Sequence, residues 1–130
     1  MILVDTSAWV EYLRGTGSPL HRRLRSLLER GTPLATTDPV VMEILAGARD
    51  DTHATRLKRM LHALEHRTVL PEDFQEAARI HRTCRGAGAT VRPLMDCLVA
   101  AVAIRENLSV LAWDRYFKAV SMRTSLRLDE

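Results

Sequence analysis

The sequence predicts an α/β domain of three layers, in which helices cover both faces of a mainly parallel central sheet. Strand-like and helix-like segments alternate along the whole chain, which is the pattern that βαβ units produce. Several strand candidates are short runs that are apolar at every position, as central parallel strands buried on both faces are. One predicted helix, at residues 93–104, is apolar almost all round, and such a helix belongs in the middle of a domain.

Length and composition set the class of protein. With 130 residues, of which 46% are hydrophobic and 27% charged, we expect one globular domain over residues 1–130. The longest uninterrupted apolar run, Cys97 to Ile104, is too short to span a membrane. The N-terminus lacks the features of a signal peptide, so we expect a cytoplasmic protein. Cys84 and Cys97 have no metal-binding or CxxC spacing, and we expect both to be buried, reduced thiols.

The first half of the chain contains two strand–helix alternations. A strand is expected at residues 2–4, followed by a helix at residues 6–13 whose Thr6 and Ser7 can cap it. A stripe of leucines at residues 20–28 predicts a second helix. Residues 34–37 form the next strand candidate, and the Asp38-Pro39 pair after it begins a helix that ends at Gly47.

The second half continues the alternation. Apolar residues recur at helical spacing around Leu57 and again from Phe74 to Cys84, while β-branched and apolar runs precede Pro71 and Asp114. The elements expected here are a helix at 57–64, a strand at 68–70, a helix with the stripe Phe74, Ala77, Ala78, His81 and Cys84, a helix from Pro93, a strand at 109–113, a helix at 116–120 and a strand at 126–128.

Four carboxylates adjoin segments that should belong to the core. Asp5 and Asp114 are each the first charged residue after an apolar strand, the place where sites form in open parallel sheets. Glu43 and Asp96 lie inside predicted helices with apolar neighbours. An isolated buried carboxylate costs several kcal/mol, and a helix N-terminus offsets only about 0.3–1 kcal/mol of that. If the four converge, a hard divalent cation such as Mg²⁺ or Mn²⁺ would relieve their repulsion, and such a site can hydrolyse phosphodiesters.

Each of these acids also has a purely structural interpretation. Asp5 and Asp114 can begin turns, Glu43 can pair with an arginine, and Asp96 can complement the first turn of its helix. The joint pattern favours one shared site over four independent coincidences.

Four segments of the chain together resemble the PIN-domain ribonucleases, and specifically the VapC toxins of bacterial toxin–antitoxin pairs. The segments are ILVDTSAW at residues 2–9, MEILAG at 42–47, RPLMDCLVAA at 92–101 and DRYF at 114–117. This resemblance covers essentially the whole chain. It implies a three-layer α/β/α PIN domain with Mg²⁺-dependent endoribonuclease activity on structured RNA, often a tRNA or rRNA loop. It also implies a homodimer and inhibition by a cognate VapB-like antitoxin.

Roles for individual residues follow from the same resemblance. Asp5 and Asp96 correspond to the primary Mg²⁺ ligands, Glu43 to the acid that holds the metal's water or a second ion, Asp114 to the fourth carboxylate, and Ser7 to a hydroxyl that orients an acid or contacts the phosphate. Arg92, just before the apolar helix, is interpreted from its position alone: it either steadies a substrate phosphate or pairs with an acid.

The chain departs from the family pattern beside Asp114. Many relatives carry Thr or Ser at the position of Ala112 and an acid at the position of Tyr116, so the prediction is weaker on this side of the site. A degenerate PIN domain that binds or dimerises without catalysis is therefore one alternative. An aspartyl phosphatase is a second alternative, although that chemistry usually needs an acid at the position of Ser7. In the nuclease interpretation, water attacks the RNA phosphodiester and leaves a 5′-phosphate and a 3′-hydroxyl.

Overall fold

A single parallel sheet organises the fold. The computed structural model describes residues 1–88 and 93–129, and in this part of the chain the strands follow the order β3-β2-β1-β4-β5. Every neighbouring pair of strands is parallel, which confirms the predicted parallel sheet. The strands are β1 (Ile2–Val4), β2 (Leu34–Thr37), β3 (Glu65–Arg67), β4 (Ser109–Leu111) and β5 (Arg127–Leu128).

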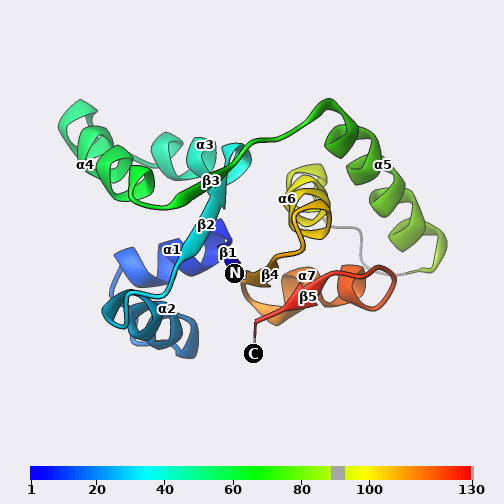
Figure 1. The fold of residues 1–130 in the computed structure, drawn as a ribbon, viewed down its shortest axis with the longest axis horizontal. Helices are drawn as coiled ribbons and strands as arrows, with labels where there is room; N and C mark the ends of the chain where they lie inside the picture. The colour runs from blue at the N-terminus through cyan, green and yellow to red at the C-terminus, as the bar shows by residue number, and fades with distance from the viewer. Residues whose placement is uncertain (89–92, 130) are drawn as a thin grey trace.

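Helices cover both faces of this sheet, as predicted. Figure 1 shows α1 and α2 on one side and α5, α6 and α7 on the other, with α3 and α4 beside β2 and β3. The helices are α1 (Thr6–Leu13), α2 (Pro19–Glu29), α3 (Asp38–Ala46), α4 (Asp51–His62), α5 (Pro71–Gly86), α6 (Leu94–Arg105) and α7 (Asp114–Ser121).

The order of the strands identifies where a site can form. From β1 the chain continues to β2 and β3 on one side, and it then returns to β4 and β5 on the other side of β1. In open parallel sheets, ligands bind outside the carboxyl ends of the strands at such a reversal. The ends of β1 and β4, at Val4 and Leu111, therefore border the expected crevice.

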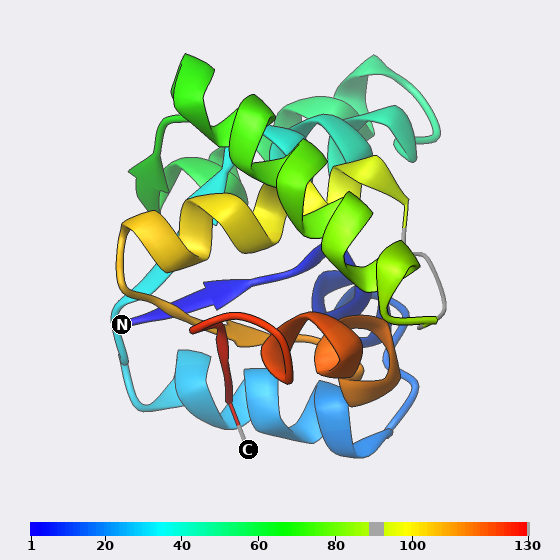
Figure 2. The same cartoon turned by 90° about the vertical axis from the view of Figure 1, so that its right-hand side faces the viewer.

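The apolar helix α6 lies in the core, as its sequence predicts. Its residues from Cys97 to Ala103 are all buried. In Figure 2, α5 (green) lies across α6 (yellow to orange), and the two helices pack against each other. Cys84 on α5 and Cys97 on α6 are both buried, as expected, and no disulfide joins them. No helix in the described residues is long and apolar enough to cross a membrane.

The prediction of a strand at residues 68–70 is wrong, because β3 lies just before it at Glu65–Arg67. The backbone of 68–70 bonds side chains instead of a neighbouring strand. The carbonyl of Thr68 accepts from Arg105, the N–H of Val69 donates to Asp38, and the N–H of Leu70 donates to Asp73. The charged and polar sequence of β3 hides its strand character, yet it suits the edge of a sheet, where charges prevent pairing with other chains.

Helix positions differ from the prediction in two smaller respects. On α5 the buried face includes Ile80, whereas Phe74 is 60% exposed, so the predicted stripe is rotated around the helix. α4 spans Asp51–His62, so it begins and ends earlier than the predicted 57–64, whereas α3 begins at Asp38 as predicted, with Thr37 as its N-cap.

A buried ion pair joins α5 to α6. Arg105 at the end of α6 donates from Nε and Nη2 to the two carboxylate oxygens of Asp73 in the first turn of α5, each at 2.9 Å. The Asp73 side chain is only 3% exposed. Burial raises the pKa of Asp73, but the hydrogen bonds from Arg105 and from the Leu70 N–H, together with the charge of Arg105, lower it further, so the net pKa lies below the usual range.

We expect Arg105→Met to destabilise the fold by about 2–3 kcal/mol at neutral pH, because it leaves the Asp73 carboxylate buried without its cation. Since the pKa of Asp73 is depressed in the folded state, the pair contributes stability above the pKa of the unfolded chain. That contribution is lost as the pH falls through the folded pKa. Urea unfolding of both proteins across the acidic range measures the difference.

Arg79→Met is the matched control. Arg79 pairs with Glu76 on the exposed side of the same helix, where ion pairs contribute about 0–1 kcal/mol. Equal losses in the two variants, or a loss at Arg105 that does not shrink at low pH, would contradict this account.

Candidate active site

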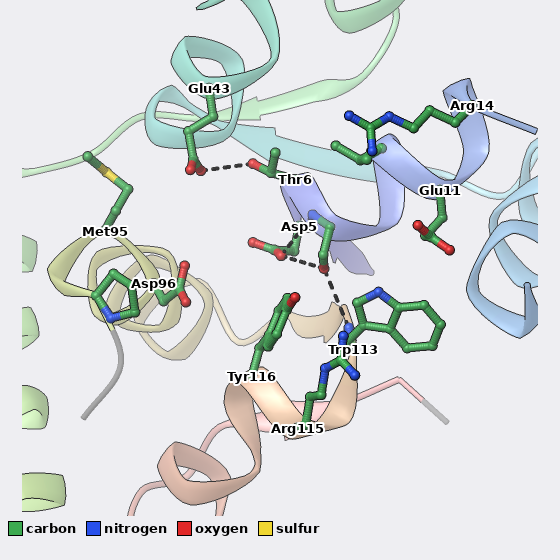
Figure 3. A pocket seen from close by; sticks show the side chains of 13 residues that line it. Asp5, Thr6, Glu11, Arg14, Glu43, Met95, Asp96, Trp113, Arg115 and Tyr116 are labelled. Carbon is green, nitrogen blue, oxygen red and sulfur yellow. Dashed lines mark hydrogen bonds between the residues drawn. The ribbon is translucent and has the colours of Figure 1, made fainter. Parts of the chain in front are cut away.

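A cavity of about 500 Å³ opens at the carboxyl ends of β1 and β4. Figure 3 shows its lining side chains, which come from the length of α1 and both of its caps, from α3, from the start of α6 and from the start of α7. Three of the predicted carboxylates lie here together: Asp5, Glu43 and Asp96. They are separated by 38 and 53 residues in the sequence, so it is the parallel sheet that brings them to one place.

Asp5 is the most constrained of the three. It is 4% exposed and is the N-cap of α1, a role that we had expected of Thr6 or Ser7. Its Oδ2 accepts a hydrogen bond of 3.0 Å from the Ser7 N–H and one of 2.7 Å from the Ser7 hydroxyl. The Ser7 Oγ in turn accepts from the Trp113 N–H at 3.4 Å. Ser7 therefore fixes the carboxylate of Asp5 and links it to the segment after β4.

The pKa of Asp5 is raised by its surroundings in the cavity. Burial raises the pKa of this carboxyl above its usual range, and the two hydrogen bonds from Ser7 oppose the shift. The negative charges of Asp96 and Glu43 raise the pKa further. Asp5 is therefore close enough to Asp96 and to Glu43 to be repelled by both, and a cation bound beside it would be stabilised.

Glu43 reaches the cavity from an open face of α3. The sequence suggested an apolar setting, but Glu43 is exposed and its neighbour Met42 is 53% exposed. The hydroxyl of Thr6 donates to Oε1 of Glu43 at 2.9 Å, as the dashed line in Figure 3 shows. Thr6 thereby holds one carboxylate oxygen in place and leaves the other available.

Asp96 stands in the first turn of α6 and is partly buried. Its N–H donates to the Pro93 carbonyl at 3.0 Å, so it lies where a helix N-terminus favours a negative charge. This setting agrees with both interpretations of Asp96, the structural one and the functional one.

Asp114 is not among the residues that line this cavity. It lines an adjoining hollow with Pro19, Leu20 and Arg23, and its place in the carboxylate set stays a prediction. Asp114 is exposed in the first turn of α7, where the helix N-terminus alone accounts for a carboxylate. Arg92, the other predicted contact, lies outside the described residues.

Several cavity residues were not predicted as parts of the site. They are Thr6, Glu11, Arg14, Trp113, Arg115 and Tyr116. Thr6, Trp113, Arg115 and Tyr116 stand one or two positions from a predicted acid, which was the available signal for them. Nothing in the sequence indicates that Arg14, at the far end of α1, reaches the same cavity.

The donor chemistry of the cavity fits a hard divalent cation. Its ligand atoms are carboxylate and hydroxyl oxygens, without cysteine or histidine, which suits Mg²⁺ or Mn²⁺ rather than Zn²⁺. No three acidic, histidine or cysteine residues within the described ranges lie close enough to share one ion. Mg²⁺ usually binds one or two carboxylates and retains several waters, and Asp5 with Asp96 satisfies that requirement.

The sequence matches one protein family and several characterised relatives along nearly its whole length. Residues 2–122 match the family described as PIN domain. Over 129 residues the chain is 45% identical to VapC ribonuclease Mb1587 of Mycobacterium bovis and to ribonuclease VapC11 of Mycobacterium tuberculosis. Each alignment covers 98% of this chain and 96% of the relative.

Solved structures share the fold at low sequence identity. VapBC2 from Rickettsia felis, bound to a DNA fragment from its promoter, superposes with a TM-score of 0.77 at 19% identity, covering 99% of this chain and 98% of that one. VapC20 of Mycobacterium tuberculosis, described as a sarcin-ricin loop cleaving toxin, gives a TM-score of 0.68 at 20% identity, covering 92% and 94%. These likenesses support the fold.

We expect Asp5→Asn to stabilise the metal-free protein by roughly 0.5–2 kcal/mol at neutral pH. Because the pKa of Asp5 is raised in the folded state, its ionisation costs folding free energy as the pH rises from the unfolded pKa through the folded one. Asparagine keeps the N-cap and removes the charge. Urea unfolding with a chelator, from about pH 3 to about pH 8, tests this.

The gain should vanish at the acidic end, where Asp5 is protonated in both states. Asp5→Ala is the comparison, since it removes the same charge but also the cap, at a cost of about 1 kcal/mol. A wild-type protein that is more stable than Asp5→Asn at every pH would contradict the assigned repulsion.

Proposed function

This chain belongs to the PIN-domain family, among the VapC ribonucleases, and from that premise we propose that it is a metal-dependent endoribonuclease and the toxin of a toxin–antitoxin pair. One observation carries the proposal: Asp5, Glu43 and Asp96 come from three separate elements to line one cavity at the reversal point of the sheet. Carboxylates so arranged in an open cavity suit the cleavage of a phosphodiester with a divalent ion.

In this proposal, Asp5 and Asp96 would hold Mg²⁺, for which Mn²⁺ could substitute, and Glu43 would accept a proton from the attacking water. The bound ion would supply positive charge to the phosphate and lower the pKa of a water. Ser7 orients the Asp5 carboxylate through its two hydrogen bonds. Thr6 holds Oε1 of Glu43, which leaves Oε2 to accept the proton of the attacking water.

The cavity also contains the charges that a polyanionic substrate needs. Arg14 and Arg115 line it, and neither makes an ion pair with a carboxylate in the described part of the chain. A guanidinium binds phosphate oxygens with a planar pair of donors. These two side chains can therefore hold the RNA backbone on either side of the scissile phosphate.

RNA is the proposed substrate because the relatives that share 45% identity are named ribonucleases. We propose a structured RNA cut in an unpaired loop of a tRNA or rRNA; the structural neighbour VapC20 is described as cleaving the sarcin-ricin loop. The VapBC complexes among the neighbours support a VapB-like antitoxin as partner. We further propose a homodimer of single-domain chains, each spanning residues 1–130, that acts in the cytoplasm.

A non-catalytic PIN domain is the second candidate. It is favoured by the position of Asp114 outside the cavity and by Ala112 and Tyr116, where many relatives carry a hydroxyl and an acid. The aspartyl phosphatase alternative has less support, because the place of its second acid is occupied by Ser7, whose hydroxyl donates to Asp5.

We expect Asp5→Asn and Asp96→Asn each to reduce RNA cleavage by about a hundredfold or more, because each removes a charged ligand of the metal. Asp114→Asn is the matched control: it makes the same acid-to-amide change outside the cavity and should retain most of the activity. Cleavage of total RNA by the purified, folded variants provides the measurement. Full activity in Asp5→Asn would exclude this mechanism, and a loss in Asp114→Asn as large as in Asp5→Asn would assign Asp114 to the carboxylate set.

Removal of divalent ions should abolish cleavage, and Mg²⁺ or Mn²⁺ should restore it. If water attacks the phosphorus, mapped ends should carry a 5′-phosphate and a 3′-hydroxyl. Cyclic phosphate ends would instead indicate attack by the 2′-hydroxyl. Titration calorimetry of Mg²⁺ or Mn²⁺ into the wild type and into Asp5→Asn separates catalysis from the non-catalytic alternative, for which no saturable binding is expected.

A further inference from the structure

An arginine lies over two aromatic rings at one wall of the cavity. The guanidinium carbon of Arg115 lies 5.6 Å from the centroid of the Trp113 ring and 5.2 Å from that of the Tyr116 ring. Both distances fall within the range of cation–π interactions. Figure 3 shows the three side chains together, on the opposite side of Asp5 from Glu43.

The three residues are placed by the connection from β4 to α7. Trp113 is the N-cap of α7, and Arg115 and Tyr116 belong to the first turn of this helix. Ser7 accepts a hydrogen bond from the Trp113 N–H, so the same serine that fixes Asp5 also fixes the start of this cluster. Ser7 therefore links the backbone at the start of this cluster to the carboxylate of Asp5.

Exposure divides the cluster into a fixed part and an accessible part. Trp113 and Tyr116 are partly buried, whereas Arg115 is exposed, and all three line the cavity. Arg115 has no carboxylate partner among the described residues, so its donors can bind an anion. Aromatic rings beside a guanidinium that has no carboxylate partner in the described residues are a combination on which unpaired nucleotides stack.

We propose that Trp113, Arg115 and Tyr116 form a nucleotide-binding platform that stacks one unpaired RNA base next to the scissile phosphate. The rings bind the face of the base, and Arg115 binds the adjoining phosphate. Because a base inside a duplex presents no free face, the platform selects single-stranded RNA. This inference rests on the proposed function, since it assumes that RNA enters the cavity.

The position of Tyr116 supports this assignment. A carboxylate at this point would repel the phosphate of the same nucleotide, whereas a phenol ring adds stacking surface without charge. Tyr116 thus adds ring surface and no negative charge to the wall on which the platform lies.

Binding in the presence of a chelator tests the platform separately from cleavage. The probes are a single-stranded oligoadenylate of about ten nucleotides and a blunt-ended RNA duplex of the same length. Of the two tryptophans of the chain, Trp9 is fully buried, so quenching of the fluorescence should report on Trp113. We expect single-stranded RNA to quench the emission and to bind more tightly than the duplex.

Substitutions then distinguish stacking from general loss of structure. Trp113→Ala and Tyr116→Ala should each weaken single-strand binding roughly ten- to a hundredfold. Tyr116→Phe, which keeps the ring and removes the hydroxyl, should retain most of the affinity. Phe74→Ala is the matched control, because it removes an exposed aromatic ring that does not line the cavity.

Two results would overturn the platform: equal affinity for the single strand and the duplex, or wild-type affinity in both alanine variants. Either result can coexist with normal metal-dependent cleavage, in which case the proposed function stands. Conversely, a wild-type protein that binds and stacks the single strand but cleaves no RNA with any divalent ion retains the platform and rejects the nuclease.

Discussion

The carboxylate of Asp5 is the constraint on which the rest of the structure depends. It is buried at the end of β1, where an ionised acid is costly. Two hydrogen bonds from Ser7 and the N-terminus of α1 offset part of this cost, while Asp96 and Glu43 add to it. Without a cation, the site therefore retains an unfavourable concentration of negative charge. Such an arrangement reduces stability where function requires it.

Much of this fold could be predicted from the sequence because its central elements are uniformly apolar. β1 and β4 are continuous apolar runs and α6 is apolar nearly all round, so local pattern and tertiary position agree. β3 was misplaced because an edge strand needs no apolar face, and its charged residues carry no strand signal. The Asp73–Arg105 pair could not be predicted, since it joins residues that are 32 positions apart.

The candidate site was predictable where an acid interrupts an apolar element and not elsewhere. Asp5 and Asp96 meet that condition and line the cavity. Asp114 follows β4 closely, as Asp5 follows β1, but Asp5 is the N-cap of α1 whereas Asp114 is the first residue inside α7, and successive helical positions point about 100° apart. Sequence spacing alone does not specify this rotation. The contribution of Arg14 was equally hidden, since only the packing of α1 against its neighbours directs it to the cavity.

A cavity that concentrates acids must still admit a polyanion, and the distribution of charge around it indicates how. The acids lie around Asp5, whereas Arg14 and Arg115 stand at other parts of the lining without carboxylate partners in the described residues. The phosphate nearest the acids needs a cation between itself and them, but the flanking phosphates can be bound by the arginines directly. Neutral aromatic rings beside Arg115 then add affinity that does not depend on charge. In the proposed mechanism, metal, guanidinium and ring would thus act on successive parts of one nucleotide chain, and the substrate would be held without any weakening of the acids that the chemistry requires.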